Sequence, residues 1–111
     1  MKTTIILNSE SLGRGNEKLG KQLMGSFLRK LWASGKKPDM IIFYNSAVKL
    51  LAQGSSVLDA LDALSKAGVD LVACGTCVEY YKLNDKITVG RVSDMQEIVS
   101  IMLKSEKVIT V

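Results

Sequence analysis

Short apolar runs alternate with longer segments of helical periodicity along this 111-residue sequence, and this alternation constrains the fold most. The pattern is typical of a parallel sheet with helices on both faces, because each parallel strand needs a crossover before the next strand begins. Five runs rich in β-branched or apolar residues are the expected strands: Thr3 to Leu7, Met40 to Tyr44, Leu71 to Ala73, Ile87 to Val89 and Val108 to Val111. The sequence therefore predicts an α/β fold with three layers, α/β/α, around a mainly parallel five-stranded sheet.

The first expected crossover carries the strongest helix signal. Its apolar residues recur at helical spacing, with charged residues on the other side. The apolar set is Leu19, Leu23, Met24, Phe27, Leu28, Leu31 and Trp32. Gly35 and Pro38 are expected to end this helix. Gly20 and Gly25 lie inside it at a cost of about 1 kcal/mol each relative to alanine, so we expect close packing there.

Three serines precede other helix-like segments and are predicted caps. Ser46 is the expected cap of a short helix through Leu51. Ser56 with Asp59, and Ser93 with Gln96, have the spacing of a capping box. These signals concern the fold and carry no functional information.

Length and composition are those of one compact domain over residues 1–111, because 47% apolar residues lie well above the disordered range. No apolar run approaches the roughly 18 residues that span a bilayer, and the run at residues 5–7 is too short for a signal peptide. Two cysteines at local spacing fit a reducing compartment. We therefore expect a cytoplasmic protein that does not bind membranes.

The net charge of +4 and the pI near 9.1 raise the question of nucleic-acid binding. The basic residues are scattered, however, and only Lys36 and Lys37 form a local pair. With 5% aromatic residues there is no obvious stacking surface for single strands. We expect no nucleic-acid partner, and interpret the charge as attraction for small anions or acidic proteins.

The two cysteines form a Cys74-Gly75-Thr76-Cys77 box directly after an expected buried strand. In an open α/β sheet the carboxyl ends of the strands border the crevice in which ligands bind. Right-handed crossovers bring the loops 8–16, 45–46 and 74–77 to the same edge. This convergence is the predicted active site, with Cys74 and Cys77 as its catalytic residues.

Thiol chemistry is the chemistry that this box favours. A cysteine at the start of a helix is favoured as a thiolate, and Cys77 lies about one turn after Cys74. Gly75 is expected to let the backbone approach a ligand closely. The sequence has no histidine, which excludes a Cys-His proton relay within one chain. Direct exchange of sulfur or electrons between thiols remains, and it needs no cofactor.

Other residues of the converging loops are candidates for a substrate or anion pocket. Arg14 and Gly15, in a Gly-Arg-Gly turn, are placed to bind an anion, although a purely structural turn is an equal reading. Asn8 and Asn45 either orient a ligand or cap the following segment. Thr76 completes the pocket within the cysteine box. No third glycine or P-loop motif follows, so neither NAD nor ATP is expected.

Several alternatives stay open at this point. Both cysteines can be small core residues, as is common in intracellular proteins. A zinc site needs about four ligands, whereas one chain offers two cysteines and no histidine, so we expect no metal. Tyr80 and Tyr81 either wall the cysteine pocket or pack in the core. Arg91 is expected to be a solvated loop charge.

The sequence also resembles a known family nearly from end to end. The stretches that carry the resemblance are GRGNEKLG at 13–20, FYNSAVKL at 43–50 and, most specifically, GVDLVACGTCVEYY at 68–81. These are similar to the DsrE-like domain of YedF-type selenium-metabolism proteins, a sulfurtransferase-like group within the DsrE/DsrF-like family. The resemblance implies a DsrE-like fold of flavodoxin-like arrangement and assembly into homo-oligomers, often dimers, trimers or hexamers.

In DsrE-like sulfur carriers the sulfur-accepting cysteine follows a strand, and Cys74 occupies the matching position here. The resemblance thus implies that Cys74 carries a sulfane sulfur or its selenium equivalent as a persulfide, received from a donor protein and passed to an acceptor, with Cys77 as the resolving thiol. YedF-type proteins usually add an N-terminal TusA-like domain with a Cys-Pro-x-Pro motif. Here the sole proline is Pro38, so a relay from such a domain either uses a separate TusA-like partner or does not operate.

Two further hypotheses compete with the sulfur carrier. The spacing of Cys74 and Cys77 also occurs in thiol-disulfide redox or sensing modules. The apolar helix faces also fit a non-catalytic oligomeric adaptor with inert cysteines.

Overall fold

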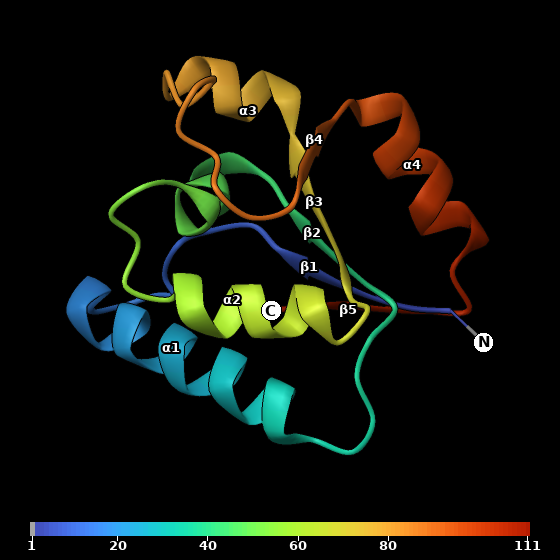
Figure 1. Ribbon diagram of the computed structural model, residues 1–111, viewed down its shortest axis with the longest axis horizontal. Helices are drawn as coiled ribbons and strands as arrows, with labels where there is room; N and C mark the ends of the chain where they lie inside the picture. Colours follow the sequence, from blue (N-terminus) through green and yellow to red (C-terminus); the bar gives the residue numbers. More distant parts are fainter. Residues whose placement is uncertain (1) are drawn as a thin grey trace.

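The computed structural model describes residues 2–111 and shows five strands in one sheet (Figure 1). The strands are β1 (Thr3–Leu7), β2 (Met40–Phe43), β3 (Asp70–Cys74), β4 (Arg91–Ser93) and β5 (Lys107–Thr110). Their spatial order is β4-β3-β2-β1-β5, and every neighbouring pair is parallel. The predicted parallel α/β sheet is confirmed, and four of its five strands end within one residue of the predicted positions.

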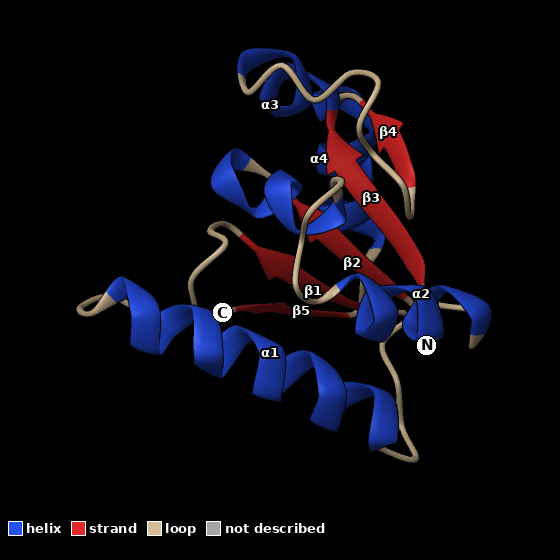
Figure 2. Ribbon diagram, turned by 60° about the vertical axis from the view of Figure 1, so that its left-hand side comes forward, coloured by secondary structure: helices blue, strands red, loops and turns tan. Residues whose placement is uncertain are grey.

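Helices cover the two faces of the sheet unequally (Figures 1 and 2). One face is covered by α1, α2 and a 3-10 helix, η1, and the other by α4 alone, while α3 lies at the carboxyl ends of the strands. The bounds are α1 (Glu17–Ala33), η1 (Asn45–Leu51), α2 (Leu58–Lys66), α3 (Gly75–Tyr80) and α4 (Met95–Lys104). Within residues 2–111, no helix has the length and apolar character needed to cross a membrane.

Alternate residues of the central strands enter two separate cores. On the α1 and α2 side, Ile5 of β1 is in register with Ile41, which is in register with Leu71, and all three are buried. On the α4 side the buried cluster is smaller and consists of Ile6, Ile42, Val72, Cys74 and Ile98. Burial on both faces explains why these strands read as unbroken apolar runs.

The N-cap residues of α1 and α4 are Asn16 and Asp94. The Asn16 side chain accepts a hydrogen bond from the N–H of Leu19 at 2.9 Å, and the Asp94 side chain accepts one from the N–H of Glu97 at 2.9 Å. Both are N-cap contacts that satisfy an otherwise unpaired N–H group.

The caps predicted at Ser46, Ser56 and Ser93 are wrong. Neither η1 nor α2 has a side-chain cap, and Ser93 lies one residue before the true cap of α4. Ser46 instead accepts a hydrogen bond from the N–H of Glu10 at 3.1 Å. The Ser46 hydroxyl thus joins the loop after β1 to the start of η1 instead of capping the helix.

The fourth strand is the other correction: it is Arg91–Ser93, not Ile87 to Val89. Ile87 forms an isolated antiparallel bridge with Ala52, and the N–H of Thr88 donates to the Leu51 carbonyl at 2.9 Å. The apolar run therefore packs against the end of η1, and Gly90, with φ of +83°, turns the chain into the strand. Residues 91–93 are largely exposed at the sheet edge, so they need little apolar character.

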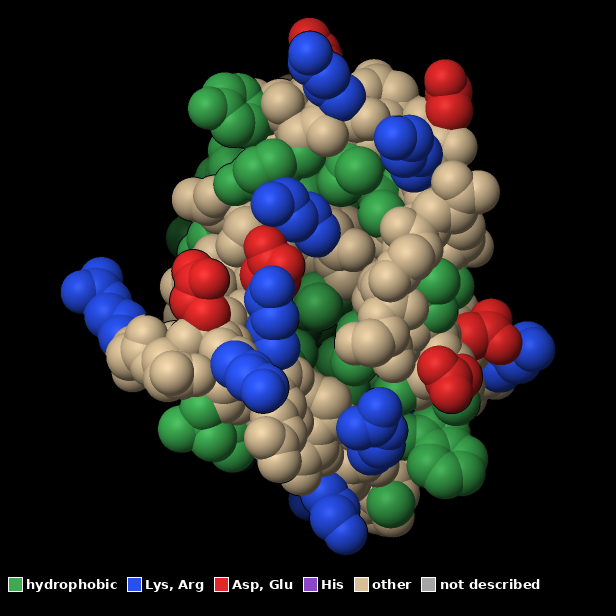
Figure 3. Space-filling model, turned by 90° about the vertical axis from the view of Figure 1, so that its left-hand side faces the viewer, with side chains coloured by type: hydrophobic (Ala, Val, Ile, Leu, Met, Phe, Trp, Pro, Cys, Tyr) green, Lys and Arg blue, Asp and Glu red, His purple; other side chains and the backbone are tan. Residues whose placement is uncertain are grey.

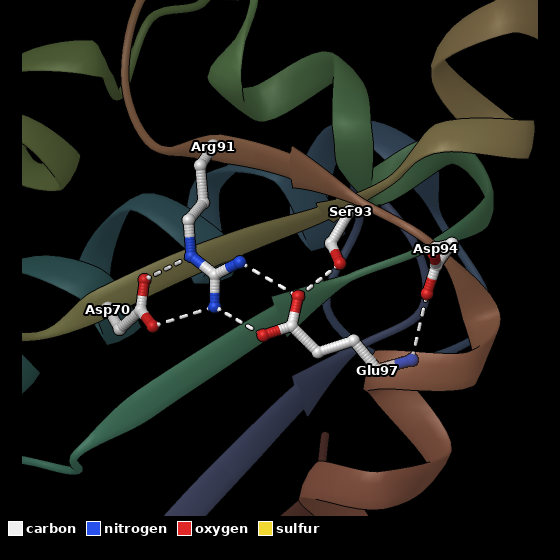
Figure 4. A network of polar contacts seen from close by, with 5 residues as sticks. All are labelled: Asp70, Arg91, Ser93, Asp94 and Glu97. Atoms are coloured by element: carbon white, nitrogen blue, oxygen red, sulfur yellow. Dashed lines mark hydrogen bonds and ion pairs between the residues drawn. The ribbon is translucent and has the colours of Figure 1, made fainter.

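Arg91, expected as a solvated loop charge, holds this edge strand through carboxylates (Figure 4). Its guanidinium donates to both oxygens of Asp70 at 3.0 Å, and to the two oxygens of Glu97 at 2.8 and 3.0 Å. Ser93 also donates to the Glu97 carboxylate. Charge-assisted contacts thus join β4 to β3 and α4, in place of apolar packing.

Candidate functional site

The loops after β1, β2 and β3 meet at the carboxyl edge of the sheet, as the sequence predicts. The contact of Glu10 with Ser46 joins the first loop to the second. The N–H of Asn45 donates to the Sγ of Cys77 at 3.0 Å, which joins the second loop to the cysteine box.

Cys74 is the last residue of β3 and occupies the N-cap position of α3. It is 1% exposed, within the apolar cluster on the α4 side of the sheet. The thiol expected to accept sulfur is therefore enclosed by the protein.

Cys77 lies one helical turn further on and is partly exposed. It opens on a cavity of about 660 Å³, called here the thiol cavity. The cavity lies among the start of η1, α3 and α4, and its other lining residues are Tyr44, Asn45, Thr76, Tyr80, Tyr81, Met95 and Met102. Of the two thiols, Cys77 is thus the one that a ligand in this cavity meets.

The two thiols interact, and this affects the ionisation of Cys77. Burial raises the pKa of the Cys77 thiol, the hydrogen bond from the Asn45 N–H lowers it, and the Cys74 thiol raises it. The net direction is upward, because desolvation disfavours the charged form and exceeds the contribution of the single N–H donor.

Asn45 adopts a left-handed backbone conformation, with φ of 55°. Its side-chain oxygen accepts a hydrogen bond from the Tyr81 hydroxyl at 3.1 Å, and the Lys49 ammonium lies 4.5 Å from the centre of the Tyr81 ring. Asparagine tolerates this region of backbone space better than most residues. The contact with Tyr81 therefore supports the conformation that points the Asn45 N–H at Cys77.

Gly75 packs closely against the edge strand β4. A Cβ at this position would lie 2.8 Å from the carbonyl oxygen of Ser93. The absent side chain therefore makes room for β4, and Gly75 lines neither cavity described here.

A second cavity, of about 580 Å³, shares Tyr44 and Asn45 with the thiol cavity and is called here the arginine cavity. Its remaining lining residues are Asn8, Ser9, Ser11, Gly13, Arg14, Thr110 and Val111. Of the predicted pocket residues, Asn8 and Arg14 line this cavity, Thr76 lines the thiol cavity and Asn45 lines both. Gly15 lines neither.

Sequence reasoning missed the walls that come from distant elements. Tyr44 lines both cavities, and Met95 and Met102 of α4 line the thiol cavity. The spacing of the two methionines, two turns apart on one helix, was the available signal. Among residues 2–111 there is no group of side chains that could hold a metal ion.

Charged side chains on this side of the molecule are mixed. In the view of Figure 3, lysine and arginine side chains are spread over the whole face, with acidic side chains between them. They form no continuous basic patch among the described residues of that face.

Comparison with solved structures places this fold among known proteins. The YchN protein from E. coli superimposes with a TM-score of 0.76 at 18% identity, over 99% of this chain and 98% of that one. MTH1491 from Methanobacterium thermoautotrophicum, a protein of unknown function, gives 0.72 at 17% identity, over 99% and 98%. BT1422 from Bacteroides thetaiotaomicron, also of unknown function, gives 0.69 at 19% identity, over 99% and 95%. At these identities the likeness concerns the fold.

No curated protein matches the sequence. A family model does match, over residues 1–111, and its description is the DsrE/DsrF-like family. The family, the parallel sheet and the cysteine box at the end of β3 agree with one another. This chain belongs to the DsrE/DsrF-like family.

Proposed function

We propose that the protein carries sulfane sulfur as a persulfide on the Cys74 and Cys77 pair. The observation that carries the proposal is the arrangement of the two thiols, with Cys77 on the wall of a 660 Å³ cavity and Cys74 in contact behind it. The link of DsrE-like proteins with sulfur relay supports the same chemistry. The sequence resemblance to YedF-type proteins extends the proposal to selenium as an alternative cargo.

Accessibility favours Cys77 as the thiol that meets the donor. Its thiolate attacks the outer sulfur of a donor persulfide, R–S–SH. The donor's S–S bond breaks, R–S⁻ leaves, and Cys77 becomes Cys77–S–SH. This assignment differs from the one implied by the family resemblance, in which Cys74 receives the sulfur, because Cys74 is 1% exposed.

Two fates of the persulfide follow from the pair. An acceptor nucleophile can take the outer sulfur, which restores the Cys77 thiolate. Alternatively, the Cys74 thiolate attacks the inner sulfur of Cys77–S–SH, giving a Cys74 to Cys77 disulfide and hydrosulfide. In the second case two electrons pass from the thiols to the sulfane sulfur, so a dithiol reductant must supply two electrons to restart the cycle.

Intact-protein mass spectrometry tests the proposal. Wild type, Cys74→Ser and Cys77→Ser are incubated with a cysteine desulfurase and cysteine, or with polysulfide. We expect Cys74→Ser to keep a reductant-labile mass of one sulfur atom, because nothing resolves it. Wild type should show a mixture of persulfide and disulfide, and Cys77→Ser no adduct.

The other outcomes are equally informative. An adduct on Cys77→Ser but not on Cys74→Ser would assign the persulfide to Cys74. No adduct on any variant, with Cys77 open to alkylation in the native protein, would exclude sulfur carriage under these conditions. No alkylation before denaturation would favour the adaptor hypothesis.

A thiol-disulfide redox module is the second candidate, because the two thiols already interact. Equilibration in glutathione buffers measures the reduction potential of the pair. A potential within the cytosolic range, about −220 to −320 mV, with no stable persulfide would favour this reading. A potential far outside that range would oppose it.

A further inference from the structure

We propose that the sulfur donor is a small organic persulfide that carries a carboxylate and binds across both cavities, with its sulfur at Cys77 and its carboxylate at Arg14. This inference rests on the proposed sulfur-carrier function and specifies its donor. It is carried by the way the thiol cavity and the arginine cavity meet and by the difference in charge between them.

The two cavities share a wall. Tyr44 and Asn45 line both of them, and these residues lie between the end of β2 and the start of η1. With volumes of about 660 and 580 Å³, each falls within the usual range of small-molecule sites, about 300–1,000 Å³. The two cavities are therefore neighbours, and the proposed donor, a few residues in size, lies across the wall that they share.

The thiol cavity is suited to the uncharged end of such a molecule. Its lining includes three tyrosines, two methionines and no charged side chain. The nearby Lys49 ammonium lies over the ring of Tyr81 and 3.4 Å from the Glu10 carboxylate, so it is already engaged. An anionic group in this cavity would lose water without meeting a cation.

The arginine cavity offers the opposite chemistry. Arg14 is the one charged side chain among its described lining residues, and no carboxylate of residues 2–111 forms an ion pair with it. Glu10 is close in sequence, but its carboxylate pairs with Lys21 at 3.5 Å and with Lys49, on the wall of a separate cavity. Arg14 is therefore not neutralised by the loop that carries it.

Neutral donors and acceptors accompany Arg14. Asn8, Ser9 and Ser11, which carry an amide and two hydroxyls, are lining residues of the same cavity. The Ser11 hydroxyl donates to the Glu17 carbonyl at 3.3 Å, and the Ser9 hydroxyl accepts from the Ser11 N–H at 3.1 Å. A carboxylate at this position meets a guanidinium in a fork geometry that suits two oxygens.

Together these contacts orient the transfer. With its carboxylate at Arg14, the donor presents its outer sulfur to the Cys77 thiolate. The sulfur bonds to Cys77, the donor's S–S bond breaks, and the anion R–S⁻ leaves still attached to its carboxylate-bearing part. A purely inorganic dianion lacks the apolar part that fills the thiol cavity.

Two donors that differ only in charge test the proposal. They are the persulfide of the peptide N-acetyl-Cys-Gly-Gly and that of its C-terminal amide, and the rate of thiol release with wild-type protein is followed by mass spectrometry. The variants are Arg14→Gln, the conservative Arg14→Lys, and Arg29→Gln as a control. Arg29 is exposed on α1, lines neither cavity and carries the same charge.

We expect wild type to react about three- to ten-fold faster with the carboxylate donor than with the amide donor, since Arg14 is exposed and its attraction is partly screened. Arg14→Gln should bring this ratio close to one by slowing the carboxylate donor alone. Arg14→Lys should keep part of the preference, and Arg29→Gln all of it. Higher ionic strength should narrow the ratio in wild type.

Three outcomes would overturn the inference. The first is equal rates for the two donors in wild type, and the second is an equal loss of the preference for the carboxylate donor with Arg14→Gln and Arg29→Gln. The third is a protein-bound persulfide that reacts far faster than both small donors, at a rate that Arg14→Gln does not change. In each of these cases sulfur still reaches the cysteine pair, so the proposed function stands. If neither small donor nor protein donor loads sulfur onto wild type, the proposed function itself fails.

Discussion

At the scale of single residues, Asn45 is the connecting point of the site. Its backbone N–H contacts the Cys77 sulfur, its side chain accepts from Tyr81, and it belongs to the walls of both cavities. An N–H donor stabilises a thiolate more than a thiol, and it opposes the effect of burial on the pKa of Cys77. The reactivity of Cys77 therefore depends on how firmly Asn45 is held.

The Tyr81→Phe variant tests this dependence. Loss of the hydroxyl removes the hydrogen bond to the Asn45 side chain, so the Asn45 N–H should be less well aimed at Cys77. We expect the pKa of Cys77 to rise further, and its alkylation rate at pH 7 to fall about two- to five-fold. The rate of alkylation as a function of pH measures both.

Tyr80→Phe is the matched control, since Tyr80 is 79% exposed and its ring packs edge-on against Tyr81 at 5.2 Å. Tyr80→Phe should leave the pH profile of Cys77 alkylation unchanged. Identical pH profiles for wild type and Tyr81→Phe would contradict the positioning role of Tyr81.

At the scale of elements, the edge strand β4 is joined to the site through α3 and α4. Gly75, the first residue of α3, contacts β4 closely, and Glu97 of α4 binds Arg91 of β4. The helices that carry Cys77 and the two methionines are therefore positioned in part by the three residues of β4 at the sheet edge.

The close contact of Gly75 with Ser93 predicts the effect of Gly75→Ala. The added methyl group has no space beside the Ser93 carbonyl, so β4 or α3 must shift. We expect the free energy of unfolding to fall by about 1–3 kcal/mol. Urea denaturation measures it.

Gly35→Ala serves as the control, because a Cβ there meets nothing within 4 Å. It should change stability by no more than about 1 kcal/mol, in the stabilising direction. Equal effects of the two substitutions would show that the contact of α3 with β4 is looser than described.

The pKa of Glu97 gives a prediction about acid stability. The Arg91 guanidinium, and then the Ser93 hydroxyl, lower this pKa from 4.5 to about 2. A lowered carboxyl pKa stabilises the folded state above the ordinary value, and this contribution is lost as the pH falls from 4.5 toward 2. Glu97→Gln should therefore reduce the loss of stability over this range, as measured by denaturation at each pH.

Glu79→Gln serves as the control, because this exposed carboxylate forms no hydrogen bond or ion pair within residues 2–111. It should leave the pH dependence of stability as in wild type. If Glu97→Gln does not alter the pH dependence of stability either, the ion pair of Glu97 with Arg91 is not formed in solution.

At the scale of the whole molecule, the two faces of the sheet differ in how well they are covered. Within residues 2–111, α4 is the one helix that packs on the second face, and several apolar side chains there remain exposed. They are Met95, Val99 and Leu103 on α4, and Val108 on β5, with Leu103 81% exposed. Met95 also lines the thiol cavity, so a molecule that covers this surface would also close part of the site.

We therefore predict self-association through the exposed surface of α4, with a second copy of this chain as the partner. Sedimentation velocity should show wild type as a dimer or larger assembly. Leu103→Glu should weaken the association by at least about ten-fold, because it places a charge in an apolar contact. Lys30→Gln on α1 changes the net charge by the same amount and should have no effect. A monomeric wild type at micromolar concentration would contradict the prediction.

The sequence by itself determined the parallel sheet and the edge at which the loops meet. Strands buried on both faces must be apolar throughout, so β1, β2 and β3 were found from local composition. The edge strand β5 is largely exposed, and its β-branched residues indicated it instead. The position of the cysteine box followed from the end of β3. These features depend on neighbouring residues along the chain, which a sequence pattern records directly.

Tertiary structure alone decided β4, the caps and the roles of the two thiols. Arg91–Ser93 pairs with β3 as an edge strand, and Arg91 binds two carboxylates on other elements. These are Asp70 of β3, 21 residues earlier in the sequence, and Glu97 of α4. Cys74 is enclosed because Ile98 of α4 shares its cluster, whereas Cys77 opens on a cavity walled by α4 and η1. Burial and accessibility are set by what lies opposite in space, and the order of residues does not contain that information.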